Sequence, residues 1–502
     1  MHGAKRNAGR FLVLLAALAL AACGKGDASI VRVVTVGAEE DPFEEGTDLP
    51  LAGQLVRAST AEGLVAFDEQ GRVVPALADR WIVTDDGRSY IFRLRDGSWH
   101  DGDALSASAA RTTLRAAIAS LKDSALGLDL AGIEEIRVMA GRVIEIRLEQ
   151  PMPHLLQLLA QPELGLLNKR GGAGPMELRR EEGTALLTPI PPEELGLPAI
   201  DKFEERTRTI HLNAMPSEAA VARFNNGEAD VLLGGRIEDF PLASTVGILR
   251  GTIQLDPVIG LFGFAVMNGE GFLATAENRE AIAMAIDRDG LINAFGVGGW
   301  GPTTRIVASG LDGDLGTIGE RWSALDLEQR RALARSRVAA WRTPPKEEER
   351  DEEQAKQREG PKLRVAFPKG PGADLLFARV KQDLAAIGVQ VVRETDESKA
   401  DLRLVDEVAR YPQAIWFLNQ FNCGVQRGLC NEAADERTAE ARATEDAAAR
   451  SAILAEAELT ASNVFIPFAT PIRWSLVRSD AIGFAPNRWG WHPLMPMALR
   501  PR

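Results

Sequence analysis

The chain has few of the side chains on which covalent and acid–base catalysis depend. Its 502 residues include three cysteines and five histidines. The sequence lacks the HExxH, GxSxG and GxxxxGKS/T motifs, and no GxGxxG segment follows a predicted strand. We therefore predict a protein with no catalytic residues, no metal site and no cofactor.

Long apolar runs are also scarce. Phe11–Ala22 is apolar, follows Lys5, Arg6 and Arg10, and ends directly before Cys23. It is too short to span a bilayer, which needs about 20 residues. Small residues before a cysteine resemble a bacterial lipoprotein signal, and we favour this over an ordinary signal peptide with a chance cysteine. We predict a signal peptide over residues 1–22, a lipid on Cys23, and anchoring to a bacterial membrane in the periplasm or cell envelope.

If Cys23 is lipidated, two cysteines remain. Cys423 and Cys430 are close in sequence, and paired thiols tend to form a disulfide in an oxidising compartment. The alternative is two free thiols held apart. Two cysteines without a nearby histidine are too few for a zinc site. Cys423 and Cys430 are therefore a disulfide candidate.

Positive charge is in deficit. Lysine and arginine number 58 against 71 aspartates and glutamates, which gives a net charge of −13. An acidic surface argues against nucleic acid or an anionic membrane face as a partner. The length is ample for two or three domains with buried cores.

Glu62–Trp99 is the most distinctive stretch. In it Tyr90, Phe92 and Leu94 alternate with more polar residues, as in a half-buried strand. Asp85-Asp86-Gly87 is a turn sequence, because glycine accepts positive φ and aspartate bonds to its own backbone. The stretch predicts a small β-rich module.

Strands and helices alternate elsewhere. Ser106 is a predicted N-cap for a helix that runs to about Leu121. Residues 165–200, rich in glycine and proline, are interpreted as a crossover segment. A strand at Lys362–Phe367, a helix at Gly372–Ile387 and a strand at Val389–Val392 predict parallel strands with a right-handed crossover.

Several phrases in the chain resemble those of one family. The matching positions are Pro75-Ala76-Leu77-Ala78, Trp81, Asp85-Asp86-Gly87, Tyr90, Phe92, Leu94-Arg95, Gly97, Trp99 and His100-Asp101-Gly102, then Arg279, Ala281, Ala285, Ile286, Asp287 and Arg288. They resemble the extracellular solute-binding proteins of family 5, which include the oligopeptide-, dipeptide- and nickel-binding lipoprotein components of ABC importers. One departure is that Ser98 alone separates Gly97 from Trp99, where the family has two residues, so we expect a shortened turn.

The resemblance implies a fold and a division of the chain. The fold is α/β, of the two-lobed type II periplasmic-binding-protein (Venus-flytrap) kind, with an extra β-rich domain. Lobe I is expected to comprise residues 23–45, 175–262 and 471–502. The β-rich domain is expected at residues 46–174 and lobe II at residues 263–470.

The resemblance also implies a function and partners. A monomer of this kind captures a peptide-like or other small solute in the interlobe cleft. It then delivers the solute to ABC permease subunits that work with an ATPase. Two alternatives stay open: a binding or sensing lipoprotein that takes no part in transport, and a secreted hydrolase with an unrecognised site.

The predicted ligand-binding residues are Glu407, Arg410, Tyr411 and Trp416. In peptide-binding relatives a loop of lobe II carries an aspartate that pairs with the peptide's amine, and the resemblance places Arg410 at that position. Guanidinium suits a carboxylate or phosphate, so we expect a solute with an anionic group, or one that lacks a free amine at that end. The alternatives are that Asp406 or Glu407 receives a cation, or that Arg410 faces solvent.

Overall fold

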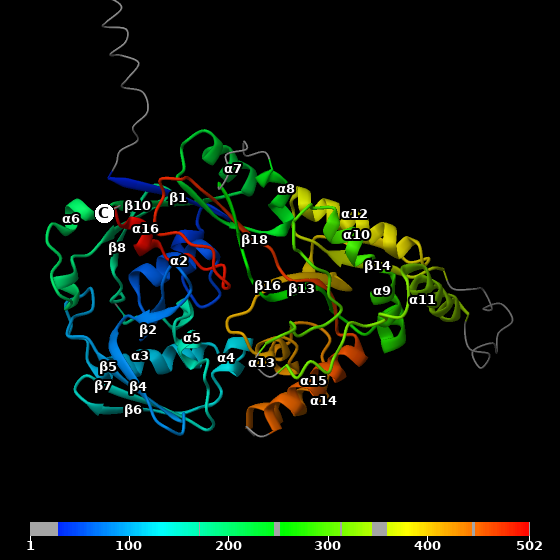
Figure 1. Ribbon diagram of the computed structural model, residues 1–502, viewed down its shortest axis with the longest axis horizontal. Coiled ribbons are helices and arrows are strands. Elements are labelled where there is room, and N and C mark those ends of the chain that lie inside the picture. The colour runs from blue at the N-terminus through cyan, green and yellow to red at the C-terminus, as the bar shows by residue number, and fades with distance from the viewer. Residues whose placement is uncertain are drawn as a thin grey trace, which may run out of the picture.

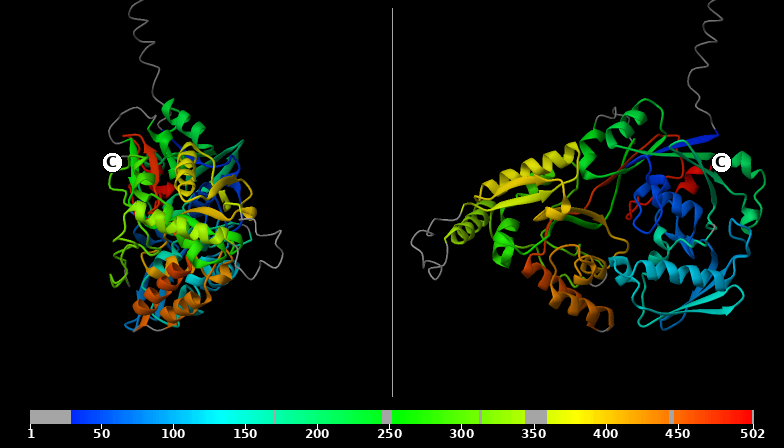
Figure 2. Two further views of the ribbon diagram at one scale, coloured as in Figure 1. Left: turned by 90° about the vertical axis from the view of Figure 1, so that its right-hand side faces the viewer. Right: turned by 180° about the vertical axis from the view of Figure 1, so that it is seen from behind.

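The computed structural model describes residues 29–500, apart from residues 170, 245–251, 312–313, 344–358 and 444–446. Cys23, the predicted lipidation site, lies outside the described residues. Within them, the strands form sheets of seven, five and four strands and one separate strand pair. The seven- and four-stranded sheets lie at one end of an elongated molecule and the five-stranded sheet at the other (Figures 1 and 2). We call these parts the seven-, four- and five-stranded units.

The seven-stranded sheet is built around β1. Its order is β12-β18-β11-β1-β10-β9-β8, and β1 runs parallel to both of its neighbours. The sequence of β1 is rich in β-branched residues, which suit a strand that is covered on both faces. The strands are β1 (Ile30–Val36), β8 (Met176–Glu181), β9 (Thr184–Pro189), β10 (Thr209–Met215), β11 (Val231–Gly235), β12 (Ile253–Asp256) and β18 (Arg473–Val477).

The predicted crossover at residues 165–200 is wrong. The antiparallel hairpin of β8 and β9 occupies much of this range and forms one edge of the seven-stranded sheet. Glu182, at φ 51°, and Gly183 make the turn. The strand pattern was hidden because β8 is an edge strand with only Met176 buried, so it carries charged residues on both faces.

The four-stranded unit is an antiparallel sheet, β4-β5-β7-β6, with short helices beside it. Tyr90, Phe92 and Leu94 are buried, as the alternation predicts. Ser106 caps its helix, since its Oγ accepts a hydrogen bond from the N–H of Ala109 at 3.2 Å. The elements are β4 (Ala78–Val83), β5 (Ser89–Leu94), β6 (Ile133–Ala140), β7 (Val143–Leu148), α3 (Ala107–Ser120), α4 (Ala125–Asp129) and α5 (Leu155–Leu159), with the pair β2 (Val65–Phe67) and β3 (Val73–Pro75) beside them.

The five-stranded unit contains the predicted parallel pair, which is confirmed as β14 and β15 joined by α12. Its order is β15-β14-β16-β13-β17, and every residue of β13 is buried. The strands are β13 (Gly260–Val266), β14 (Lys362–Ala366), β15 (Gln390–Glu394), β16 (Leu402–Val408) and β17 (Phe465–Ala469). The helices are α9 (Ala276–Ala285), α10 (Arg288–Asn293), α11 (Leu327–Arg342), α12 (Pro371–Ala385), α13 (Ala414–Asn419), α14 (Glu432–Ala443) and α15 (Ala448–Ser462).

The remaining helices belong to the seven-stranded unit. Helix α2 (Leu51–Thr60) falls in the range predicted for the β-rich domain, yet Ala52, Leu55 and Val56 pack in the core of the seven-stranded sheet. This packing moves α2 out of that domain. The other helices are α6 (Phe203–Arg206), α7 (Ser217–Asn225), α8 (Phe240–Ala243) and α16 (Leu494–Ala498).

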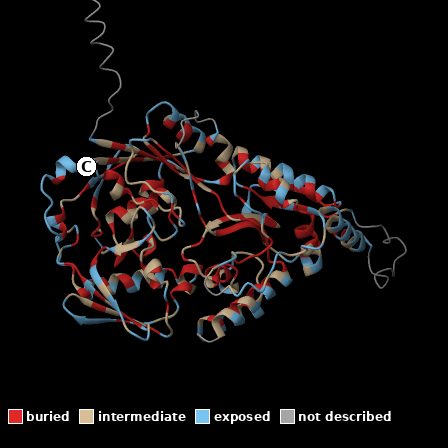
Figure 3. Cartoon of the chain, in the orientation of Figure 1, coloured by how far each residue is buried: buried red, intermediate tan, exposed pale blue. Residues whose placement is uncertain are grey.

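Two segments carry the chain between the seven- and five-stranded sheets. One joins β12 to β13, between Asp256 and Gly260, and the other joins β17 to β18, between Ala469 and Arg473. Three of the four flanking strands, β13, β17 and β18, are almost entirely buried, as their red colour in Figure 3 shows, whereas β12 is mostly exposed. These two short connections place the cleft described below beside the junction of the two sheets.

The core of the four-stranded unit gives a test of the fold. Ile144 of β7 is fully buried and Ile82 of β4 is 63% exposed. Ile144→Ala is expected to lower the free energy of unfolding by about 2–5 kcal/mol, because it leaves a cavity in the packed sheet. Ile82→Ala is expected to change it by no more than about 0.5 kcal/mol. Urea denaturation followed by circular dichroism measures both, and equal effects would contradict this sheet orientation.

Candidate ligand-binding cleft

A cavity of about 960 Å³ lies where the three units meet, and we call it the cleft. The seven-stranded unit lines it with residues 47–51, 233–236 and 473–475. The four-stranded unit contributes residues 123–126 and 161–163, and the five-stranded unit contributes residues 406–410. The lining therefore draws on loops and strand ends that are far apart in sequence.

Arg410 lines the cleft and is already paired. Its Nη2 donates to Glu163 Oε1 at 2.7 Å, and its Nη1 donates to Glu163 Oε2 at 3.0 Å and to Gln161 Oε1 at 2.8 Å. The Glu163 side chain is only 5% exposed. Burial lowers the pKa of Arg410, whereas the charge and hydrogen bonds of Glu163 raise it by more. The pKa of Arg410 therefore lies above its ordinary value. An anionic solute at Arg410 would have to compete with Glu163.

Glu407 and Trp416 also line the cleft. The carboxylate of Glu407 is paired with Arg427, whose Nη1 donates to Glu407 Oε2 at 3.0 Å and to Gln420 Oε1 at 2.7 Å. Trp416 is one of the buried residues of α13 and packs edge-on against Phe417, with ring centroids 4.9 Å apart. Both residues thus reach the cleft, but the charge of Glu407 is matched within the protein.

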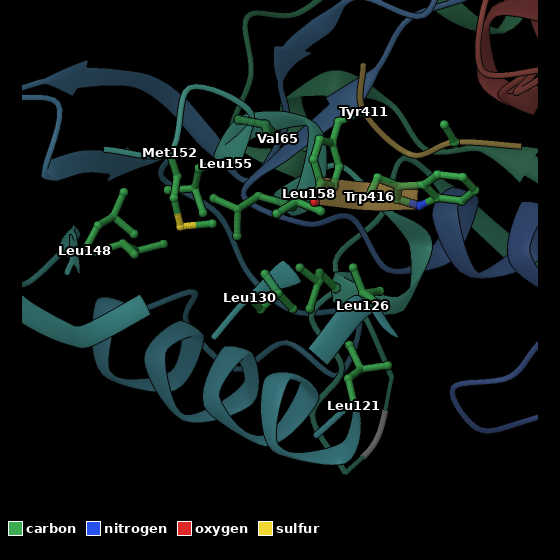
Figure 4. Close-up of a cluster of buried hydrophobic side chains, with 14 of the residues drawn as sticks. Val65, Leu121, Leu126, Leu130, Leu148, Met152, Leu155, Leu158, Tyr411 and Trp416 are labelled. Carbon is green, nitrogen blue, oxygen red and sulfur yellow. The ribbon is translucent and has the colours of Figure 1, made fainter. Parts of the chain in front are cut away.

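Tyr411 lies behind the cleft wall. It is fully buried, it is not part of the cleft lining, and its ring stacks on His154 with centroids 4.0 Å apart. Together with Trp416 it joins α13 to leucines of α4 and α5 in one apolar cluster (Figure 4). Tyr411 therefore packs between the five- and four-stranded units and does not line the cleft.

Asp129 accepts a hydrogen bond from the hydroxyl of Tyr411. The Tyr411 hydroxyl donates to Asp129 Oδ1 at 2.7 Å, and Nδ2 of Asn419 donates to the same oxygen at 2.6 Å. Burial raises the pKa of Asp129 to about 7, although these two hydrogen bonds lower it. Asp129 thus couples the contact between the units to pH.

A second contact between units lies beside the crossing segments. Arg473, at the start of β18, donates from Nη1 to Asp406 Oδ1 at 2.7 Å and from Nη2 to the Asp406 carbonyl at 3.0 Å. Close by, α12 approaches residues 237–239, and a Cβ on Gly372 would lie 2.1 Å from the Ile237 carbonyl. Only glycine permits this approach of the two backbones. Asp406 is one of the residues that the sequence offers as an alternative receptor for a cation. No sequence pattern marks Arg473 as its partner.

Aromatic rings from the chain termini complete the lining. Phe67 and Trp489 lie with ring centroids 6.3 Å apart, and Trp489 Nε1 donates to the Gly71 carbonyl at 2.8 Å. Trp491 and His492 follow in the same wall, and His492 Nε2 lies 3.1 Å from Asp256 Oδ2. No local pattern in the sequence predicts these contacts, because Trp489 lies 418 positions from Gly71 and His492 lies 236 positions from Asp256.

The disulfide candidate lies just beyond the cleft. Cys423 and Cys430 are bonded, with Cα atoms 5.2 Å apart. The loop is also held by the N–H of Cys423, which donates to Asp435 Oδ2 at 2.9 Å. The same loop carries Val425 and Arg427 into the cleft lining. The bond therefore restrains a loop that forms part of the cleft wall.

The family model for bacterial extracellular solute-binding proteins, family 5, matches residues 72–181 and 201–426, which is more than half of the chain. The chain belongs to this family. Proteins of family 5 are binding proteins and not enzymes, and the chain is accordingly a solute-binding protein. Within the described residues, no helix is both long and apolar enough to cross a membrane, and no cluster of three or more histidine, cysteine or carboxylate side chains is placed to hold a metal.

Curated relatives match in part. The probable deoxycholate-binding periplasmic protein YgiS of Escherichia coli is 33% identical over 127 residues, 20% of this chain and 23% of that protein. A putative ABC transporter peptide-binding protein of Brucella ovis is 26% identical over 258 residues, 47% of either chain. The present chain thus matches about a quarter to a half of the length of these relatives.

Solved structures show the same mixed α/β fold over nearly the whole chain. Haemophilus influenzae OppA, in a complex with the peptide RPPGFSPFR, has a TM-score of 0.77 at 17% identity, with 95% of this chain and 100% of that chain covered. The Escherichia coli murein tripeptide binding protein MppA has a TM-score of 0.77 at 18% identity, with 95% and 99% covered. The predicted α/β fold class is confirmed.

The pair of Arg410 and Glu163 can be tested by a mutant cycle. Arg410→Met is expected to lower the free energy of unfolding by about 3–5 kcal/mol, because it leaves Glu163 buried without a counter-charge. Adding Glu163→Leu is expected to recover part of that loss. Arg437→Met breaks a half-exposed pair with Glu440 and should cost less than about 1 kcal/mol. Urea denaturation measures all three, and strictly additive effects would argue against the pairing.

Asp129 predicts a pH dependence of stability. Its carboxyl has a pKa of about 7 in the folded protein and about 4 when unfolded, so the folded state holds the proton more tightly. This stabilisation is complete below pH 4, falls as the pH rises, and is lost above pH 7. Asp129→Asn keeps an oxygen acceptor for Tyr411 but cannot titrate.

Thermal melting from pH 5 to pH 8 provides the measurement. The wild type should lose more stability over this range than Asp129→Asn, and the difference between the two curves isolates Asp129 from other titrating groups. Each unit of pKa shift corresponds to about 1.4 kcal/mol. Parallel curves for the two proteins would contradict the raised pKa.

Proposed function

We propose that this protein is the solute-binding component of an ABC importer, which captures a peptide-like or other small solute in the cleft and delivers it to membrane permease subunits that work with an ATPase. The observation that carries the proposal is the cleft itself. Its volume of about 960 Å³ is in the range of small-molecule sites, and all three units line it. Relatives named as peptide-binding proteins of ABC transporters support the same class of function.

The arrangement of the units supports a mechanism of capture. We propose that the seven-stranded unit is lobe I and the five-stranded unit lobe II, and that the two crossing segments serve as the hinge. Contacts between Tyr411 and Asp129, Arg410 and Glu163, and Arg473 and Asp406 join the units around the cleft. In this conformation the cleft is closed, and rotation about the hinge would open it to solute.

The proposal includes a location. The relative YgiS is named a probable periplasmic protein, which supports export to the periplasm or cell envelope. We further propose that a lipid on Cys23 anchors the chain to a bacterial membrane. The motif before Cys23 supports this, and an anchored monomer would stay close to its permease.

Native mass spectrometry of the mature protein, purified without refolding, tests the proposal. We expect a mass excess that is lost on denaturation, since a closed cleft retains its solute. The denatured mass also reports whether the chain begins at Cys23 with a lipid attached. No excess mass, together with no thermal shift across panels of peptides, sugars and organic acids, would contradict the proposed function.

A matched pair of variants locates the bound solute. Trp491 lines the cleft, while Trp341 packs against Phe272 outside it, and both side chains are partly buried. Trp491→Ala is expected to reduce the retained mass excess and Trp341→Ala to leave it unchanged. Equal loss in both variants would place the solute elsewhere.

A further inference from the structure

The charges of the cleft lining are unbalanced. Among the described residues that line it, nine are aspartates or glutamates, four are arginines and none is lysine. Each of Arg410, Arg427 and Arg473 forms an ion pair with another lining residue. After these three pairs, six carboxyl groups remain against Arg236 and the ring of His492. Two of the six, those of Asp129 and Glu238, have a pKa raised to about 7, and that of Asp256 lies 3.1 Å from His492. A cleft lined mainly by one sign of charge concentrates solutes of the opposite sign.

Oδ2 of Asp129 and Oδ2 of Asp406 are both buried without a hydrogen-bond partner among the described residues, and of these two carboxylates Asp406 lies close to a second one, Glu238. The side chain of Asp406 is 6% exposed, and its Oδ1 is bound by Arg473, yet its Oδ2 is buried without a hydrogen-bond partner among the described residues. Glu238 forms no ion pair within the described part of the chain, and the hydrogen bond that lowers the pKa of its carboxyl comes from its own backbone. A buried carboxylate oxygen without a donor is costly, so the site is incomplete as it stands.

Glu238 and Asp406 are close enough to interact. Burial and then the negative charge of Asp406 raise the pKa of Glu238 to about 7, while Arg236 and Arg473 lower it. Arg473 is committed to Asp406, and the guanidinium of Arg236 reaches only the Asp406 carbonyl, at 3.4 Å. Both arginines thus act on Glu238 at a distance, and neither forms an ion pair with it.

Aromatic rings line the same cleft. Trp416, Trp474, Trp489, Trp491 and Phe67 are all in its lining. The faces of such rings attract cations through their quadrupole, tryptophan most strongly. Carboxylates and tryptophans together suit a group that is both positively charged and partly apolar, such as an alkylammonium or guanidinium group on a carbon chain.

We propose that the solute is an organic cation, and that Glu238 and Asp406 bind its ammonium or guanidinium group through N–H donors. The inference rests on the proposed function and names the class of solute for the same cleft. It also differs from the expectation of an anion at Arg410, because Glu163 already occupies that guanidinium.

Isothermal titration calorimetry with a matched peptide series tests the proposal. The probes are N-acetylated, C-amidated tripeptides Ala-X-Ala in which X is lysine, glutamine or glutamate, so that only the central charge differs. Spermidine and its fully acetylated form give a second pair without a peptide backbone. The wild type should bind the cationic member of each set at least about ten-fold more tightly than its neutral counterpart, as one well-placed charged contact predicts.

Two variants assign the effect to the site. Glu238→Gln is expected to remove about ten-fold in affinity for the cationic probes and to leave the neutral ones unchanged. Glu228→Gln, the same change at an exposed position outside the cleft lining, serves as the control and should bind as the wild type does. Asp406→Asn is a less direct variant because it also disturbs Arg473.

The outcomes separate this inference from the proposed function. Tighter binding of neutral or anionic probes, or an unchanged Glu238→Gln variant, would overturn the organic cation and leave solute binding intact. Identification of an anionic solute by native mass spectrometry would do the same. If no probe binds and the purified protein retains no solute, both the inference and the proposed function fail.

Discussion

The contact between α13 and the four-stranded unit is the interaction on which the cleft depends. Tyr411 is held between the His154 ring and the Asp129 carboxyl, and leucines of α4 and α5 surround it (Figure 4). This apolar cluster is continuous from the four-stranded sheet to α15. Burying this apolar surface stabilises the arrangement of the units around the cleft.

The charged side chains of the cleft fall into two groups: those paired with each other within the protein, and those left to interact with a solute. The pair of Arg410 and Glu163 joins the five- and four-stranded units, and that of Arg473 and Asp406 lies beside the segments that cross between the seven- and five-stranded sheets. Both pairs join different units, so they help to fix how the units meet. Since a buried pair resists the loss of either partner, these arginines are poor receptors for an exchangeable solute.

Features that depend on neighbouring residues could be predicted from the sequence. The parallel pair around α12, the cap of α3 and the core alternation of β5 follow from periodicity and capping chemistry, and the structure has them. Glu163 lies 247 positions from Arg410, and no local pattern announces such a partner. The hairpin of β8 and β9 was missed because an exposed edge strand lacks the alternation that a buried face imposes.

The contrast between local patterns and long-range partners also applies to the predicted ligand-binding residues. The family resemblance predicted Arg410, Glu407 and Trp416, which follow one another closely along β16, the next loop and α13, and all three line the cleft. What a solute meets there depends on residues that other units bring, above all Glu163. Under the proposed function, the protein's own contacts between the units lower the conformational cost of binding, since more of the population is competent to hold solute. Release of that solute would then require these contacts to break, so their strength would set a barrier to release as well as to the entry of water.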